Sequence, residues 1–168
     1  MTVAELRALV AFNDWANART FDAIGALTAD QLTKDLGASF PSVLLTAAHL
    51  VGAEWIWLQR WIQAPPSRFP DWVKSPELGD LRERLRAVEQ ARAGYLAGLP
   101  LDGASTVVAF KLIDGTADAQ PVDVMVRHVV NHSTYHRGQI AAFLRQLGVK
   151  PPSTDLILYA RETAQWNG

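Results

Sequence analysis

The chain of 168 residues contains no cysteine. Disulfides, thiolate zinc sites, iron–sulfur clusters and cysteine nucleophiles are therefore excluded, and histidine and carboxylate side chains remain as the strong metal ligands. A chain of this length buries enough surface to be stable without crosslinks. We expect one globular domain spanning residues 1–168. The four histidines become the residues of greatest interest.

The chain also lacks an excess of charge of either sign, because 16 basic residues stand against 17 acidic ones. No sequence-wide field would draw it onto nucleic-acid phosphates or anionic lipid. The most apolar stretch, residues 43–62, is interrupted by His49, Glu54, Gln59 and Arg60, and such groups are unfavourable in a bilayer core. The first residues show no signal-peptide pattern. We expect a cytoplasmic protein that binds neither nucleic acid nor membrane.

Three further types of site are missing from the sequence. No glutamate is followed three residues later by a histidine, which excludes the di-iron sites of helical bundles. No Gly-x-Ser-x-Gly elbow of a serine hydrolase occurs, and no glycine-rich phosphate loop. A mononuclear histidine site remains to be considered.

Apolar residues recur at three- and four-residue spacings through most of the chain, which predicts an all-α protein. We expect long helices over residues 3–27, 41–63, 75–100 and 121–147, and a last short helix over residues 155–165. Residues 106–112 are mostly β-branched or aromatic, and Asp114-Gly115 closes the segment, which predicts a short strand or hairpin. The expected architecture is a four-helix bundle with this insertion between the third and fourth helices.

The second of these helices is apolar around its whole circumference. Such a helix must be covered on more than one side. Trp55, Leu58 and Trp61 point away from the face that carries His49, and single chains seldom leave such a surface in water. We therefore expect a partner chain on this side, in a homodimer.

Three histidines follow one another at four-residue steps in the fourth helix, at His128, His132 and His136. Each step turns about 40° around a helix, so all three lie within about 80°. His132 and His136 fall inside the apolar stripe, and His128 falls at its edge. Two imidazoles at this spacing can bind one metal ion, and coordination would offset the free energy of burying them. Histidines that merely pack are the alternative.

His49 in the second helix is the natural third ligand. Its neighbours Gly52 and Ala53 are small and would leave room beside the imidazole, with Ile56 and Trp57 as walls. Three histidines with an open fourth position describe a catalytic type of site, because structural zinc is normally closed by four protein ligands. Three imidazoles accept several divalent ions, of which we expect zinc or nickel.

Residues 131–140 read Asn-His-Ser-Thr-Tyr-His-Arg-Gly-Gln-Ile, which resembles the C-terminal signature of the DinB/YfiT-like family of metalloenzymes. Residues 12–17, Phe-Asn-Asp-Trp-Ala-Asn, and residues 47–55, Ala-Ala-His-Leu-Val-Gly-Ala-Glu-Trp, are similar to the family's motifs in the first and second helices. The resemblance covers most of the chain. It implies a four-helix bundle of up-down-down-up connectivity, a homodimer, and a divalent metal held by three histidines and a water.

The resemblance implies the metal ligands His49, His132 and His136, the same residues that the helix-face argument selects. His128 is not a ligand in that pattern, and we expect it to pack or to support a ligand. The family name refers to induction by DNA damage.

Arg137 falls about 140° around the helix from His132. This position is away from the metal face. We therefore expect a salt bridge rather than a catalytic role for Arg137, with Asp155 as the candidate partner.

Some relatives are described as transferases or isomerases that use low-molecular-weight thiols such as bacillithiol, mycothiol or glutathione. A divalent ion lowers the pKa of a bound thiol or water and supplies the nucleophile that a cysteine-free chain lacks. We expect a metal-dependent enzyme that transfers such a thiol to a small-molecule substrate. The alternatives are a metal-dependent hydrolase and a non-enzymatic metal-binding stress protein. No general base can be named, because Glu54 falls about 140° from His49 and Asp14 has no clear position.

Overall fold

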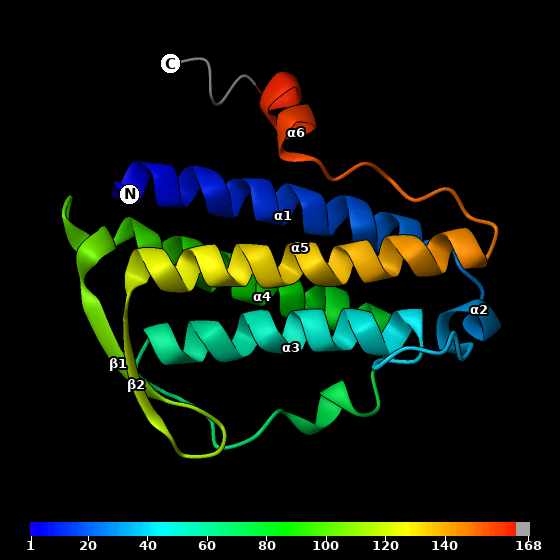
Figure 1. Cartoon of the computed structure of the whole chain (residues 1–168), viewed down its shortest axis with the longest axis horizontal. Coiled ribbons are helices and arrows are strands. Elements are labelled where there is room, and N and C mark those ends of the chain that lie inside the picture. The colour runs from blue at the N-terminus through cyan, green and yellow to red at the C-terminus, as the bar shows by residue number, and fades with distance from the viewer. Residues whose placement is uncertain (164–168) are drawn as a thin grey trace.

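The computed structural model describes residues 1–163. Its body consists of the long helices α1 (Val3–Gly25), α3 (Val43–Trp61), α4 (Leu78–Ala97) and α5 (Val122–Gln146). Helices α1 and α5 run in one direction, and α3 and α4 run in the other (Figure 1). This confirms the predicted all-α four-helix bundle and its up-down-down-up order.

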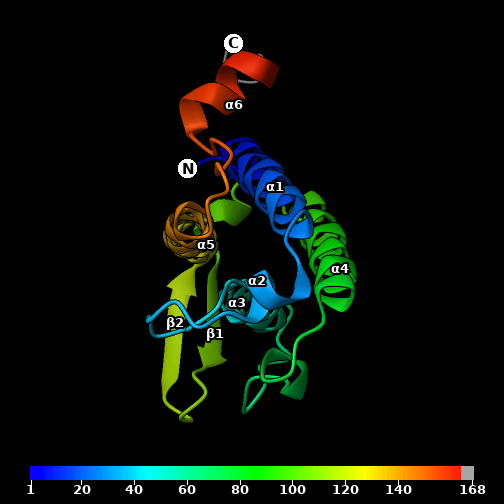
Figure 2. The same cartoon turned by 90° about the vertical axis from the view of Figure 1, so that its right-hand side faces the viewer.

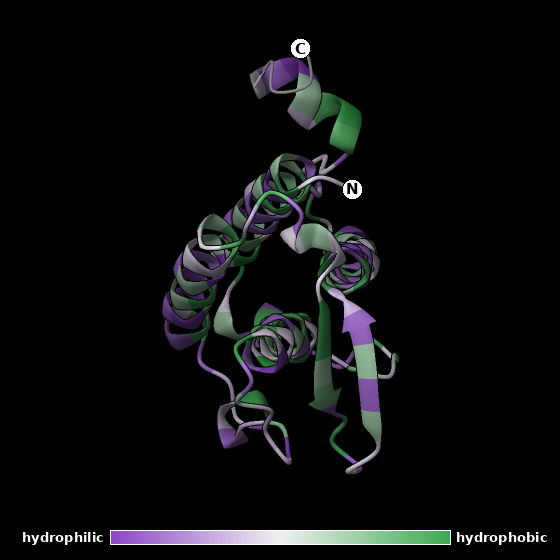
Figure 3. Ribbon diagram, turned by 90° about the vertical axis from the view of Figure 1, so that its left-hand side faces the viewer, coloured by the Kyte–Doolittle hydropathy of each residue, from purple (hydrophilic) through white to green (hydrophobic). Residues whose placement is uncertain are grey.

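Short elements connect and extend the bundle. They are α2 (Ala29–Thr33), the 3-10 turns Asp71–Val73 and Gly103–Ser105, the strands β1 (Val107–Lys111) and β2 (Ala117–Pro121), and α6 (Leu156–Thr163). The strands pair antiparallel with Val107 opposite Pro121, so the predicted insertion is a hairpin. Strand β1 is largely hydrophobic, whereas hydrophilic and mildly hydrophobic residues alternate along β2 (Figure 3). The predicted end of the last helix, at residue 165, lies outside the described residues.

The ends of α3 follow from local chemistry. The Oγ atom of Ser42 accepts a hydrogen bond from the backbone N–H of Leu45 and caps the first turn. After Trp61 the chain leaves the helix through Gln63, which has a positive φ of 62°. The proline-rich segment that follows cannot continue a helix. It crosses the bundle end to end, so α4 starts where α3 started and runs parallel to it (Figure 1).

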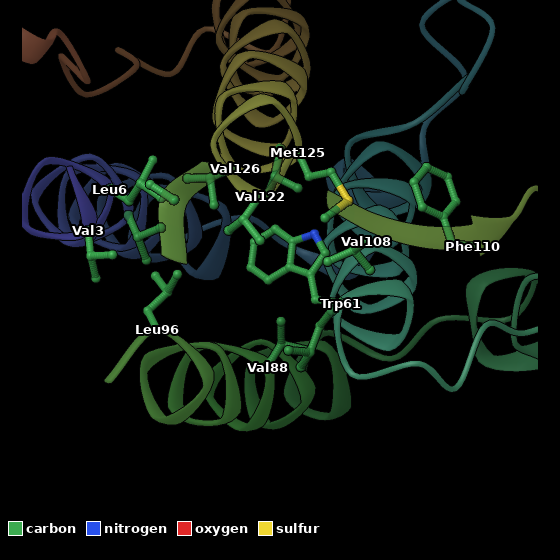
Figure 4. Packing of buried hydrophobic residues seen from close by; sticks show 14 residues of the cluster. Val3, Leu6, Trp61, Val88, Leu96, Val108, Phe110, Val122, Met125 and Val126 are labelled. Atoms are coloured by element: carbon green, nitrogen blue, oxygen red, sulfur yellow. The ribbon is translucent and has the colours of Figure 1, made fainter. Parts of the chain in front are cut away.

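The outward face predicted for α3 is wrong. Leu58 and Trp61 are buried inside the same chain, and the indole of Trp61 lies among valine and methionine side chains from α4, α5 and β1 (Figure 4). Trp55 packs against the edge of this cluster. The chain itself therefore covers the apolar circumference of α3. A homodimer stays a prediction, but this face no longer supports it.

Helix α6 lies on the outer side of α1, away from the bundle interior (Figure 2). Tyr159 anchors it, because its ring is 5.7 Å from the Phe12 ring and 5.4 Å from the Trp15 ring. None of the helices within residues 1–163 combines the length and the hydrophobicity that crossing a bilayer requires.

Candidate metal centre

Three histidine rings meet across the antiparallel pair α3 and α5. His49 comes from α3, and His132 and His136 come from successive turns of α5. The ring centroids are 4.4 Å apart for His132 and His136, 4.6 Å for His49 and His136, and 5.3 Å for His49 and His132. One ring nitrogen of each lies within 4.8 Å of the other two. The structure thus brings together the three residues that the sequence marks as metal ligands.

The two histidines of α5 have the spacing of ligands to one ion. Their Nε2 atoms are 3.2 Å apart, and two imidazoles bound to one tetrahedral ion place their nitrogens about 3.3–3.4 Å apart. Nδ1 of His136 lies 2.7 Å from Oε1 of Gln139. Because an amide oxygen only accepts hydrogen bonds, Nδ1 carries the proton and Nε2 presents its lone pair to the other rings. This donor set fits a divalent cation.

Aromatic side chains enclose the ring of His49. Phe40 stacks on it with centroids 4.1 Å apart, and Phe69 lies 5.7 Å away. A Cβ atom on Gly52 would be only 2.9 Å from Cγ2 of Val73 and 3.3 Å from the Phe69 ring. The prediction of free space beside Gly52 is therefore wrong, because the proline-rich segment after α3 folds back and fills it. The histidines sit in a more enclosed setting than the sequence indicates.

Burial keeps these imidazoles neutral. Together with repulsion from neighbouring imidazoles, it lowers the pKa of His49 and of His132 to about 4. Burial also lowers the pKa of His136, and the hydrogen bond with Gln139 acts in the opposite direction. The neutral ring is the form that binds metal, so the three rings are ready to bind near pH 7.

His128 lies beside this cluster. Its ring is 5.7 Å from the His132 ring and 4.5 Å from the Trp57 ring, and its side chain is exposed. Among residues 1–163, the converging group contains His49, His132 and His136 and leaves His128 out. His128 therefore has the position of a packing residue.

A second polar cluster lies in the bundle interior and is centred on Glu54, which is 2% exposed. Its Oε1 accepts hydrogen bonds from Nδ2 of Asn13 at 2.8 Å, Nδ2 of Asn17 at 2.7 Å and Oγ of Ser133 at 2.8 Å. Its Oε2 accepts one from Arg92. All four long helices contribute to this cluster, which therefore ties them together.

Arg92 carries the positive charge at the centre of the cluster. It is 1% exposed and pairs with both Glu54 and Asp14. Burial acts to raise the pKa of Glu54, but Arg92 and the hydrogen bonds from Asn13 and Ser133 outweigh it and hold that pKa below its usual value. Burial raises the pKa of Asp14 to about 6 against the attraction of Arg92. Glu54 is thus a fixed anion.

Arg137 belongs to the same cluster. Its Nη1 donates to Oδ1 of Asn13 and to Oδ1 of Asn17, both at 2.7 Å, and its Nη2 donates to Oγ1 of Thr134 at 2.7 Å. The predicted salt bridge to Asp155 is therefore wrong, because the guanidinium turns into the bundle instead of toward the segment before α6.

Sequence reasoning did not find this cluster, although a signal was present. Asn13 and Asn17 stand one turn apart on the buried face of α1, and Glu54 stands in an apolar helix. Buried polar groups require partners. Asking which residues of other helices satisfy these three side chains would have pointed to a shared interior network.

A model of the DinB family matches residues 1–168 of the chain. The chain belongs to the DinB family. It is similar to Protein DinB of Bacillus subtilis (strain 168), with 25% identity over 165 residues that cover 90% of this chain and 91% of that protein.

The fold of this DinB-family chain also resembles a solved structure. The crystal structure of a DinB-like protein from Bacillus cereus ATCC 10987 matches it with a TM-score of 0.67 and 18% identity. The match covers 90% of this chain and 97% of the other. At this identity the likeness supports the bundle architecture of the DinB-family chain.

Proposed function

We propose that this protein is a metal-dependent enzyme that transfers a low-molecular-weight thiol to a small electrophilic substrate. The proposal rests on one observation: three neutral imidazoles, those of His49, His132 and His136, present nitrogens to one point between α3 and α5. Three protein ligands with an open position are typical of catalytic sites, whereas structural zinc sites normally have four. The ion would be zinc or nickel.

A divalent ion at this point supplies Lewis acidity and lowers the pKa of a bound thiol or water. The residues of the chain prepare the site for it. Gln139 holds His136 in the tautomer that presents Nε2, and Phe40 stacks on His49 and shields it from water. Because the chain has no cysteine, the thiol must come from outside the protein.

Cobalt-substituted protein tests the proposal. Its visible spectrum is recorded while bacillithiol, mycothiol or glutathione is added, and each thiol is then offered together with an electrophilic acceptor. We expect a spectral change that saturates with one of these thiols, and conjugation that is lost on chelation. His49→Ala should lose both signals, whereas Arg127→Gln, an exposed change on α5, should retain them.

A cobalt protein whose spectrum responds to none of these thiols would contradict thiol transfer. Hydrolysis of a small ester or amide that depends on metal would then establish the hydrolase alternative. Metal binding without either activity would identify a non-enzymatic metal-binding protein.

A further inference from the structure

Arg60, in the last turn of α3, is a buried arginine that forms no ion pair with any carboxylate of residues 1–163. It is 6% exposed, and its Nε atom is buried without a partner. Within residues 1–163 its guanidinium forms no ion pair and donates no hydrogen bond. Arg92 and Arg137 also leave Nε without a partner, but their Nη atoms are engaged, because those of Arg92 pair with two carboxylates and those of Arg137 donate to three side-chain oxygens. The two Nη atoms of Arg60 are not among the fully buried atoms and donate no hydrogen bond within residues 1–163, so their N–H groups are available to an external anion.

Two aromatic rings hold the Arg60 guanidinium in place. Its Cζ lies 4.4 Å from the centroid of the Trp57 ring and 5.3 Å from that of Phe110 on β1. The two rings themselves meet edge to face at 5.5 Å. Stacking of this kind uses the faces of a guanidinium and leaves its N–H edges for an oxyanion. The arginine is therefore held in position before any ligand arrives.

The carboxylate of Asp118 acts on Arg60 electrostatically but does not form an ion pair with it. Burial lowers the pKa of Arg60, and Asp118 on β2 raises it only partly. Oδ1 of Asp118 instead accepts hydrogen bonds from the backbone N–H of Ala119 at 2.7 Å and from Nε2 of Gln120 at 3.0 Å. Asp118 thus belongs to the hairpin and leaves the edges of the guanidinium without a partner.

Arg60 and the three-histidine site share one face of α3. Arg60 comes eleven positions after His49, which is about 20° around the helix and ~16 Å along it. The rings of Trp57, His128 and His132 follow one another between the two sites at 4.5 Å and 5.7 Å. His128 is exposed and Trp57 is half-buried, so a ligand can reach this line of rings from the surface.

We infer that Arg60 is the anion-binding residue of a subsite beside the hairpin. It takes the carboxylate or phosphate group of a small molecule whose body lies along Trp57 and His128 toward the histidine cluster. Its role toward a substrate rests on the proposed function, but anion binding itself needs no metal. Anion binding at Arg60 and metal-dependent thiol transfer can therefore be refuted independently of each other.

Nuclear magnetic resonance of the full-length, metal-free, ¹⁵N-labelled protein tests the subsite. The Nε–H signal of Arg60, assigned by its loss in Arg60→Lys, is followed while succinate, inorganic phosphate or neutral succinamide is added at constant ionic strength. We expect a saturable shift with succinate or with phosphate and none with succinamide. The oxyanion that saturates at the lower concentration identifies the group that the subsite prefers.

Three variants decide the role of Arg60. We expect Arg60→Gln to weaken binding of the preferred anion at least tenfold, and Arg60→Lys to weaken it less, because lysine keeps the charge but loses the planar fork. Arg127→Gln removes an exposed arginine of α5 that pairs with Asp123 and should leave binding unchanged. Equal affinity in wild type and Arg60→Gln would overturn the inference.

Arg60→Gln also removes packing against two aromatic rings and could unfold the chain. Its circular dichroism and melting temperature are therefore recorded first. If Arg60→Gln does not fold, anion binding is judged from the affinity of Arg60→Lys and from whether the Nε–H signal of the wild type saturates. A wild-type signal that moves linearly, without saturation, with every salt would show that Arg60 only packs.

Discussion

Glu54 shows what the sequence could and could not reveal at the scale of single residues. The four-residue spacing of His132 and His136 predicts that they share one face of their helix. The small residues beside His49 and the family resemblance predict that His49 is the third ligand. The position of Glu54 in an apolar helix signals that it needs partners but not which ones, because those come from α1, α4 and α5. Contacts between helices far apart in the sequence cannot be read from the period of one helix.

Replacing Glu54 should therefore destabilise the whole bundle. Glu54→Gln keeps the shape of the side chain but removes the charge that faces buried Arg92. Breaking a buried ion pair from one side typically costs about 3–5 kcal/mol of unfolding free energy. Urea denaturation measures the loss, with Glu83→Gln, an exposed change on α4, as the control. A loss below about 1 kcal/mol would mean that the cluster is not a true ion pair.

Glu89 should make stability fall as the pH rises. Burial, with repulsion from Asp14 and Glu54, raises its pKa to about 8, against the attraction of Arg92 and Arg86. The folded state then holds a proton that the unfolded state releases near its ordinary pKa of about 4.3. The free energy of unfolding is therefore unaffected by the titration of Glu89 below pH ~4, and it falls progressively as the pH rises from ~4 to ~8.

Glu89→Gln removes this dependence. We expect its melting temperature to match that of the wild type near pH 4 and to exceed it increasingly toward pH 8. Each kcal/mol gained corresponds to about 2–4 °C for a chain of this size. Thermal unfolding followed by circular dichroism across this range gives the answer, and parallel curves for the two proteins would contradict the assigned pKa.

At the scale of elements, periodicity predicted the positions of the four long helices well. It predicted poorly which elements pack against each helix face. Helix α3 is apolar on every side. This predicts that other elements cover it, but it does not identify those elements. The structure covers it with α4, α5 and β1 instead of a second chain. Strand β2 (Ala117–Pro121) has little β propensity of its own, and its pairing with β1 produces it.

The loop with Phe69 and Val73 packs on Gly52 of α3, so alanine substitutions at Gly52 and at an uncovered helix glycine should differ in their effect on stability. A methyl group added to Gly94 on α4 would meet no neighbouring atom within 4 Å, so Gly94→Ala should stabilise the protein by about 0.5–1 kcal/mol through helix propensity. Gly52→Ala should lack this gain, because the new methyl meets Val73 and Phe69. Adding Val73→Ala should restore part of it. Equal gains for both glycines in urea denaturation would show that the loop does not pack on α3.

At the scale of the whole molecule, the helix order creates the candidate site. The up-down-down-up arrangement sets α3 antiparallel to α5 (Figure 1), so His49 meets two residues more than 80 positions later in the chain. The Glu54 cluster ties the same two helices to α1 and α4. A homodimer remains a prediction, which the mass from light scattering at micromolar concentration would test.

Calorimetric titration of zinc into metal-free protein without a histidine tag tests the central claim most directly. We expect one ion per chain, and a loss of affinity of at least 100-fold in His49→Ala, His132→Ala and His136→Ala, because removing a ligand exceeds the 10–100-fold effect of a supporting residue. His128→Ala should stay within about threefold, as its ring lies outside the converging group. Equal losses in all four variants, or none in any, would contradict the three-histidine site.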